Sequence, residues 1–220
     1  MGTSNKSRKL PAEPLTELEV VGLIKACSRR APTGIRNAAL IAVLYRSGLR
    51  IGEALALMPK DVDIDRCTIR VLHGKGDKAR LIGVDEQTCV FLARWLDVRK
   101  QLGLTTRHPV FCTITVGNRW KPGLMLEPAY IRSLLPRIAR KAGIEKRVHA
   151  HGLRHSHAFE LANEGVPMHV IQQQLGHSNL SVTNRYISHL GSVEVVAAIK
   201  SRRWSILAGI NRGRSSDDSH

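Results

Sequence analysis

The spacing of hydrophobic and polar residues predicts a mostly helical chain. In several stretches apolar residues recur every three or four positions, as they do on the buried face of a helix. Prolines, glycines and capping residues mark the ends of these stretches, and Thr16 with Glu19 has the spacing of a capping box. The helices expected from these signals cover about residues 16–27, 35–47, 51–58, 85–102, 127–142 and 193–203.

One segment changes to the alternating pattern of β-strands. Residues 67–72 and 79–84 are rich in strand-forming residues, and the segment HGKGDK between them has glycines that suit the tip of a hairpin. The polar side chains of Lys75, Asp77 and Lys78 would project from that tip. The expected fold class is therefore mainly α with a small antiparallel β-sheet (α+β).

The stretch from His149 to Leu190 concentrates cationic side chains. In a helix that begins near His151, residues three and four apart share a face, so His151, Arg154 and His155 point the same way. The apolar residues predicted for that buried face are Ala158, Phe159, Leu161 and Ala162, and those predicted for the opposite face are Ser156, His157, Glu160, Asn163 and Glu164. A buried charge without a partner is costly, so we expect an anion to meet these cations.

The helix that follows is expected to lie between Pro167 and Gly176, which are typical start and stop signals. This position places His177 directly after a helix end. Ser181 can cap a further short helix, which would carry Tyr186 back toward the same cleft. The residues that these two helices and two turns would bring together are His151, Arg154, His177 and Tyr186.

The composition points to a polyanionic partner. The 220 residues include 34 Lys and Arg against 18 Asp and Glu, which gives a formal net charge of +16. In a chain without an apparent membrane span this excess favours nucleic acid, although a soluble basic protein would have the same composition. The hydrophobic content of 43% is enough for a core. We expect a flexible basic arm at 1–12, one domain at 13–203 and a polar tail at 204–220.

Cysteine and histidine spacing argues against a metal or disulfide scaffold. The four cysteines are far apart and form no C-x-x-C pair; they are Cys27, Cys67, Cys89 and Cys112. A histidine cluster at 149–157 could suggest zinc, but Arg154 lies within it and would repel a metal cation. The N-terminus has no apolar signal region, and no run of residues approaches the length of a membrane span. We therefore expect a cytoplasmic protein with no metal and no other cofactor.

Four segments together resemble the catalytic domain of the tyrosine recombinase (phage integrase) family. They are YRSGLRIGEALAL at 45–57, LHGKGDKARLIGV at 72–84, HGLRHSHAFEL at 151–161 and LGHSNLSVTNRYISHL at 175–190. A single G-L-R carries almost no information, but the ordered set is highly specific, and the likeness covers about residues 13–200. The resemblance implies the fold of that catalytic domain, double-stranded DNA as the partner, and a bacterial protein associated with the nucleoid.

The resemblance further implies that Arg50 and Arg154 hold the two non-bridging oxygens of the scissile phosphate, while Glu53 steadies the site. Chemistry favours these residue types independently. Charge that grows on phosphorane oxygens is best met by a fixed planar fork of donors, which arginine supplies and lysine does not. Alternatively, Arg50 and Glu53 would form an ordinary surface ion pair worth less than about 1 kcal/mol.

The resemblance also implies roles in bond breaking for four further residues. Tyr186 would attack the phosphate to form a 3′-phosphotyrosyl link, and Lys75 would protonate the leaving 5′ oxygen. His151 would transfer protons, and His177 would support the phosphate and the tyrosine. A phenol with a pKa of about 10 needs a base or nearby cations to attack at neutral pH, and the histidines and arginines supply both without a metal. Taken singly, Tyr186 would suit a packing role and Lys75 a solvated turn.

These features predict an enzyme that breaks and rejoins DNA, namely a site-specific recombinase or integrase of a mobile element. Candidates for additional DNA contacts are Lys78, Arg80, Arg119, Lys121 and Arg132, although a solvated basic face would look the same. The resemblance implies a homo-tetramer on DNA in which the segment at 193–203 is exchanged between protomers. Two alternatives remain open: DNA relaxation of the type IB topoisomerase kind, and a DNA-binding module of the same fold without catalysis.

Two features depart from the usual pattern of the family. Members usually carry a helical module before this domain that clamps the far side of the DNA, and here a short arm precedes it. We therefore expect either a catalytic-domain fragment or a naturally short member. In addition, His157 stands where an apolar residue is commoner, and we expect it to loosen the packing beneath Arg154.

Overall fold

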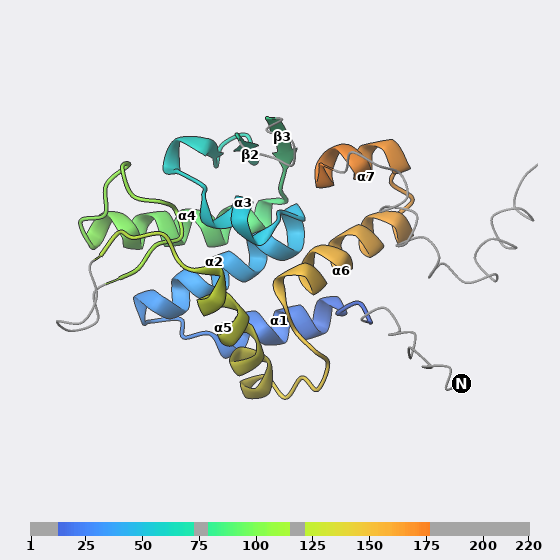
Figure 1. The fold of residues 1–220 in the computed structure, drawn as a ribbon, viewed down its shortest axis with the longest axis horizontal. Helices are drawn as coiled ribbons and strands as arrows, with labels where there is room; N and C mark the ends of the chain where they lie inside the picture. Colours follow the sequence, from blue (N-terminus) through green and yellow to red (C-terminus); the bar gives the residue numbers. More distant parts are fainter. Residues whose placement is uncertain (1–12, 73–78, 115–121, 177–220) are drawn as a thin grey trace, which may run out of the picture.

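The computed structural model describes residues 13–72, 79–114 and 122–176 (Figure 1). Within these ranges it contains seven α-helices, one short 3₁₀-helix and a three-stranded antiparallel sheet, which confirms the predicted fold class. The helices are α1 (Glu17–Ala26), α2 (Pro32–Ser47), α3 (Ile51–Leu55), α4 (Glu86–Gln101), α5 (Pro128–Lys141), α6 (Ala150–Asn163) and α7 (Met168–Leu175), with the 3₁₀-helix η1 at Pro59–Asp61. The strands are β1 (Val62–Asp63), β2 (Thr68–Val71) and β3 (Arg80–Gly83).

Helix α2 forms the centre of the core. Its apolar run AALIAVL is buried, and α1, α4 and α6 pack around it (Figure 1). The helix ends at Gly48, which has a left-handed φ of 64°. A Cβ at this position would lie 2.5 Å from Leu175 and 2.8 Å from His157, so glycine is required both by the turn and by the close approach of α6 and α7.

The sheet follows the chain order β1-β2-β3 and carries one buried face. The predicted hairpin pairs Ile69 with Ile82 and Val71 with Arg80. Ile69, Val71 and Ile82 are buried, as the alternation predicts, whereas Leu81 on the other face is exposed. Strand β1 was not predicted, because a two-residue strand is too short to show any alternation. The hairpin tip itself, at 73–78, lies outside the described residues.

The buried face predicted for α6 is confirmed for Arg154, His155 and Ala158 but was wrong for other residues. Ser156 and His157 were expected to face outward, but they are 0% and 5% exposed, whereas Phe159 and Leu161 are only half-buried. The reason is that α6 is covered on more than one side. It packs against α2 and α7, and the backbone N–H of Leu15 donates to Oγ of Ser156 at 2.8 Å, so the segment before α1 covers a further side.

Several predicted helix ends are confirmed, and others lie beyond what the structure describes. The capping box of Thr16 and Glu19 is present at the start of α1, and α7 lies between Pro167 and a left-handed Gly176. Helix α3 ends at Leu55, earlier than expected, because the chain has already turned before Pro59. The predicted N-terminal arm, the short helix after Ser181, the helix at 193–203 and the C-terminal tail lie outside the described residues.

Candidate functional site

A carboxylate held by two arginines lies between α3 and β3. Glu53 accepts hydrogen bonds from Arg50 through the backbone N–H, at 2.9 Å, and through Nη1, at 2.8 Å. Arg80 approaches the same carboxylate as a two-pronged fork, with Nη1 3.0 Å from Oε1 and Nη2 2.8 Å from Oε2. We call Arg50, Glu53 and Arg80 the Glu53 cluster. The shared carboxylate fixes the two arginines, one from the start of α3 and one from β3, in a single arrangement.

The Glu53 cluster carries excess positive charge. Burial disfavours the ionised form of Glu53, but the hydrogen bonds from Arg80 and Arg50 outweigh this effect and hold the pKa of the carboxyl below its ordinary value. Two guanidinium groups and one carboxylate therefore sum to +1 at neutral pH. The side chains of Glu53 and Arg80 are 5% and 13% exposed, whereas that of Arg50 is 32% exposed. Arg50 is thus the member of the cluster that an outside anion can reach.

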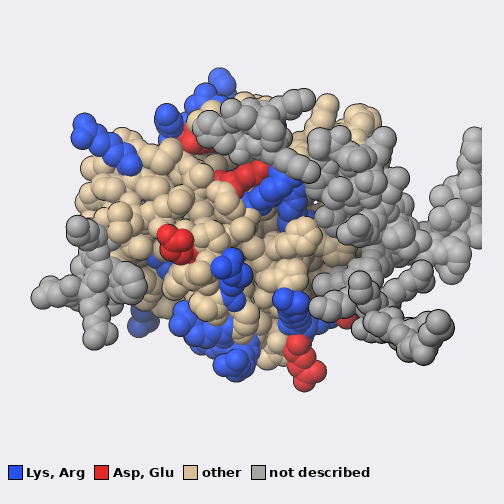
Figure 2. Space-filling model, viewed as in Figure 1, with Lys and Arg blue, Asp and Glu red and all other residues tan. Residues whose placement is uncertain are grey.

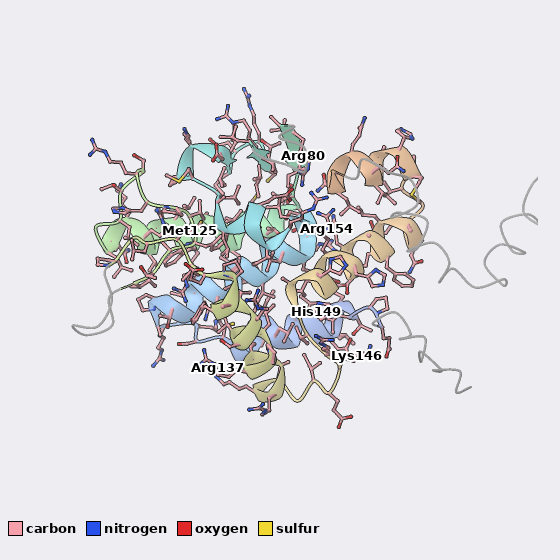
Figure 3. The ribbon with its side chains drawn as sticks, viewed as in Figure 1. Arg80, Met125, Arg137, Lys146, His149 and Arg154 are labelled. Atoms are coloured by element: carbon pink, nitrogen blue, oxygen red, sulfur yellow. The ribbon has the colours of Figure 1, made fainter. Side chains whose placement is uncertain are left out.

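Arg154 lies where two helices end. It is 2% exposed, and its guanidinium donates to the carbonyl of Gly48 after α2 and, at 2.7 Å, to the carbonyl of Leu175 at the end of α7. The C-terminal end of a helix carries partial negative charge, which stabilises a cation there. Nη2 of Arg50 donates at 3.1 Å to the carbonyl of the next residue, Gly176. The end of α7 therefore holds both arginines for which the resemblance implied a phosphate contact; Arg154 is labelled in Figure 3.

The two histidines at the start of α6 have different positions. His149 caps the helix, since its Nδ1 accepts from the backbone N–H of Gly152 at 2.7 Å. Burial, together with the charges of Arg147 and His151, lowers the pKa of His149, which keeps the ring neutral and able to accept this bond. His151 is exposed, stacks on the His149 ring at a centroid distance of 6.4 Å, and lies one turn before Arg154. An exposed imidazole near the arginines suits the proton-transfer role expected of His151.

A second network of charges lies at the C-terminal end of α2, before the turn at Gly48. Nε of Arg46 is 2.7 Å from Asp85, and its Nη1 is 3.0 Å from Glu160. The hydroxyl of Tyr45 also donates to Glu160. We call these four residues the Arg46 network. One guanidinium between two carboxylates sums to −1 when both are ionised, and burial raises the pKa of Glu160. A cavity of about 280 Å³ lies beside the network, lined also by His157 and Val170.

Half of the predicted site residues are described by the structure. Those that are described are Arg50, Glu53, Arg80, Arg132, His151 and Arg154, and those outside the described residues are Lys75, Lys78, Arg119, Lys121, His177 and Tyr186. The structure brings Arg50, Glu53 and Arg154 together around the end of α7. Arg80, predicted as a DNA contact, has its guanidinium committed to Glu53.

Arg132 belongs to a separate basic surface on α5. It is exposed together with Arg137, Arg140 and Lys141. Lys and Arg side chains gather over this helix in the lower part of Figure 2, and Figure 3 shows Arg137 on the opposite side of the molecule from Arg80. Of these four residues, Arg132 alone was predicted as a DNA contact, although the helical period would have placed the other three on the same polar side of α5.

Metal sites, disulfides and membrane-spanning helices are not found in the part of the chain that the structure describes. Within residues 13–72, 79–114 and 122–176, no group of three or more His, Cys, Asp or Glu side chains is arranged to hold a metal ion. The cysteines Cys27, Cys67, Cys89 and Cys112 are free thiols. None of the described helices has the length and apolar character needed to cross a membrane.

Comparison with known proteins gives this arrangement a context. The sequence profile of the Phage integrase family matches residues 13–191. The chain belongs to this family. The tyrosine recombinase XerD of Neisseria meningitidis serogroup B is 31% identical over 186 residues, which are 84% of this chain and 61% of that protein. The tyrosine recombinase XerC of Halalkalibacterium halodurans is 33% identical over 179 residues, 81% of this chain and 58% of that protein. The chain thus spans about three fifths of these relatives.

Solved structures of family members have the same fold. The XerA recombinase superposes with a TM-score of 0.71 at 31% identity and covers 89% of this chain and 67% of its own. The XerH site-specific recombinase, in a post-cleavage complex with a palindromic difH substrate, gives a TM-score of 0.66 at 29% identity and covers 90% of this chain and 55% of its own. The predicted resemblance and fold are therefore confirmed.

Proposed function

We propose that this chain is the catalytic domain of a site-specific DNA recombinase that works through a 3′-phosphotyrosine intermediate. The observation that carries the proposal is the convergence of Arg50 and Arg154 on neighbouring carbonyls, those of Gly176 and Leu175. Like charges brought this close repel each other, and a bound phosphate relieves the repulsion. Family membership and relatives named tyrosine recombinases support the same conclusion.

In the proposed reaction the phenolic oxygen of Tyr186 attacks the scissile phosphorus. The bond from phosphorus to the 5′ oxygen breaks, the phenolic proton passes to a base for which His151 is the candidate, and Lys75 gives a proton to the leaving 5′ oxygen. Arg50 and Arg154 stabilise the charge on the non-bridging oxygens, with His177 as a further donor. A 5′ hydroxyl of a partner strand then attacks the phosphotyrosine and releases Tyr186, so the bond energy is retained.

The proposed partner is double-stranded DNA. The exposed arginines of α5 and the formal charge of +16 support binding to phosphates, and the XerH relative was solved with its DNA substrate. We include in the proposal a homo-tetramer that exchanges the segment at 193–203, and action in the bacterial cytoplasm at the nucleoid. Lys78, Arg119, Lys121 and Arg132 remain proposed DNA contacts.

Covalent trapping tests the proposal. The chain is incubated with a library of duplexes that carry a nick and randomised sequence, so that cleavage releases a short fragment and leaves the protein attached. We expect adducts that resist denaturation, and sequencing of the attached DNA gives the target site. Tyr186→Phe should abolish the adducts while DNA binding is retained.

The chain offers matched controls, because it contains only three tyrosines. Tyr130→Phe and Tyr45→Phe should keep the adducts. Undiminished adducts with Tyr186→Phe, or none with the unaltered chain, would refute the proposal. Relaxation of supercoiled DNA of unrelated sequence without recombinant products would instead indicate topoisomerase activity.

A further inference from the structure

We propose that Arg80 is a positioning residue, which acts through Glu53 to keep the charge of Arg50 available for the scissile phosphate. This inference rests on the proposed function. It replaces the expectation that Arg80 itself contacts DNA, and it gives the strand that follows the hairpin tip a role in the phosphate site.

The guanidinium of Arg80 is enclosed rather than free to reach DNA. Both of its terminal nitrogens bind the Glu53 carboxylate, and Nε lies 3.5 Å from the carbonyl of Gln174 in α7. A Cβ at Gly176 would lie 2.8 Å from Cζ of Arg80, so the end of α7 covers the guanidinium closely. Figure 3 shows Arg80 extending from β3 toward the region where Arg154 also lies. Arg80 therefore links β3, α3 and the end of α7.

Charge balance gives this link a function. Without Arg80, the carboxylate of Glu53 would be paired with Arg50 alone, and the pair would have no net charge. A phosphate would then have to compete with Glu53 for the Arg50 guanidinium. With Arg80 present, each oxygen of Glu53 is shared between two donors, Arg50 remains 32% exposed, and the cluster keeps a charge of +1. The same carboxylate fixes the orientation of Arg50 without cancelling its charge.

Substitution of Arg80 provides the first test, on the DNA site recovered by trapping. Arg80→Met should lower the rate constant of adduct formation at saturating DNA about 30-fold. This loss is smaller than that expected when a direct donor to the phosphate is removed. The Kd for DNA should change less than about 3-fold. Arg80→Lys keeps the charge but loses the fork, and should recover part of the rate. Arg70→Met is the control, since Arg70 in β2 is half-exposed and pairs with Asp61, away from Glu53. Equal rates for Arg80→Met and the unaltered chain would overturn the inference.

A double substitution tests whether Arg80 acts through Glu53. If it does, adding Arg80→Met to a chain that already carries Glu53→Gln should lower the rate less than about 2-fold further, because the shared carboxylate is already gone. If the two effects multiply, Arg80 acts independently of Glu53 and the inference fails.

Modified phosphates separate an effect on Arg50 from an effect on the neighbouring hairpin tip. A methylphosphonate at the scissile position removes the anionic oxygen that Arg50 would neutralise, so the defect of Arg80→Met should shrink to less than about 3-fold. A sulfur in place of the 5′ bridging oxygen leaves without protonation, so it should rescue Lys75→Ala but not Arg80→Met. The opposite pattern would show that Arg80 acts on the hairpin tip and would overturn the inference.

A measurement without DNA separates failure of the inference from failure of the proposed function. The side-chain Nε–H signal of Arg50 in a ¹H–¹⁵N spectrum is assigned by its loss in Arg50→Lys. In Arg80→Met we expect this signal to shift and broaden. The backbone amide signals should keep the dispersion of the folded protein. An unchanged Arg50 signal would overturn the inference whatever the activity. Absence of adducts from the unaltered chain would refute the proposed function alone.

Discussion

The Glu53 cluster and the Arg46 network lie on either side of the turn at Gly48 that ends α2, and they are opposite in charge. Both fix an arginine near the C-terminal end of α2 with bonds of similar length. In the Arg46 network one guanidinium lies between two carboxylates, so its charge is fully met within the protein. In the Glu53 cluster two guanidinium groups share one carboxylate, and Arg154 lies nearby.

This difference teaches that charge balance, rather than the presence of ion pairs or of a cavity, decides which of the two regions is expected to attract an anion. The cavity of about 280 Å³ lies on the side of the Arg46 network, and Arg46, which lines it, is paired with Asp85 and Glu160. The Glu53 cluster lies at the end of α7, where Arg50 donates to the carbonyl of Gly176 and Arg154 to that of Leu175. A substrate phosphate is therefore expected at the cluster with the surplus cation.

The largest contrast is expected in catalysis. Arg50→Met should lower adduct formation about 10³-fold, because a fixed donor to the developing charge is lost, whereas Arg46→Met should change it less than about 3-fold. Rates measured at saturating recovered DNA, with both variants confirmed as folded, check this contrast. Similar losses in the two variants would remove the distinction between the two regions.

The next effect concerns His157, which lies between the two regions. Burial, with the charges of Arg46 and Arg154, lowers the pKa of His157 to about 4, while Asp85 acts in the opposite direction. In the unfolded chain the His157 ring becomes protonated near pH 6.5, whereas in the folded chain it stays neutral down to about pH 4. The free energy of unfolding is therefore unaffected by this group above pH 6.5 and falls between pH 6.5 and about 4. The loss from this group should approach about 3 kcal/mol.

Urea unfolding as a function of pH checks the role of His157. In His157→Leu the slope of stability against pH between 6.5 and 4 should decrease by about one proton, whereas the exposed His169→Leu should keep it. An unchanged slope in His157→Leu would show that the ring is protonated in the folded chain.

The smallest effect concerns stability, and here the substitution of Arg46 is expected to have a larger effect than the substitution of Arg50. Arg46→Met leaves Asp85 and Glu160 without their shared cation and should lower the free energy of unfolding by about 1 kcal/mol, a modest value because Arg46 is about one third exposed and screened by solvent. Arg50→Met should cost less than about 0.5 kcal/mol, since Glu53 keeps Arg80. Denaturant midpoints measure both values, and a larger loss for Arg50→Met would contradict the comparison.

Much of the fold could be predicted because local signals determine it. The capping box at Thr16, the left-handed glycines at 48 and 176 and the alternation of Ile69 and Val71 are all encoded by neighbouring residues. The burial of Ser156 and His157 could not be predicted, because it depends on tertiary contacts. The segment before α1 covers Ser156, and His157 lies against Gly48 at the end of α2. Helical period identifies one buried face and cannot show that a helix is covered on several sides.

The candidate site was predictable in part for the same reason. Arg50 and Glu53 are three residues apart, so their pairing follows from the helical period. The second partner of Glu53 is Arg80, which is 27 residues further along the chain and reaches it through tertiary structure. The sequence therefore suggested DNA contact for Arg80, since an arginine beside a basic hairpin tip has no local sign of a buried partner. The positions of Lys75, His177 and Tyr186 remain predictions.

A crystal structure of Tyr186→Phe on the recovered DNA site tests the central claim most directly. We expect the non-bridging oxygens of the scissile phosphate to lie about 3 Å from the guanidinium groups of Arg50 and Arg154, with Arg80 still bound to Glu53. A phosphate that contacts Arg46 instead, or an Arg80 that has left Glu53 to bind DNA, would contradict it.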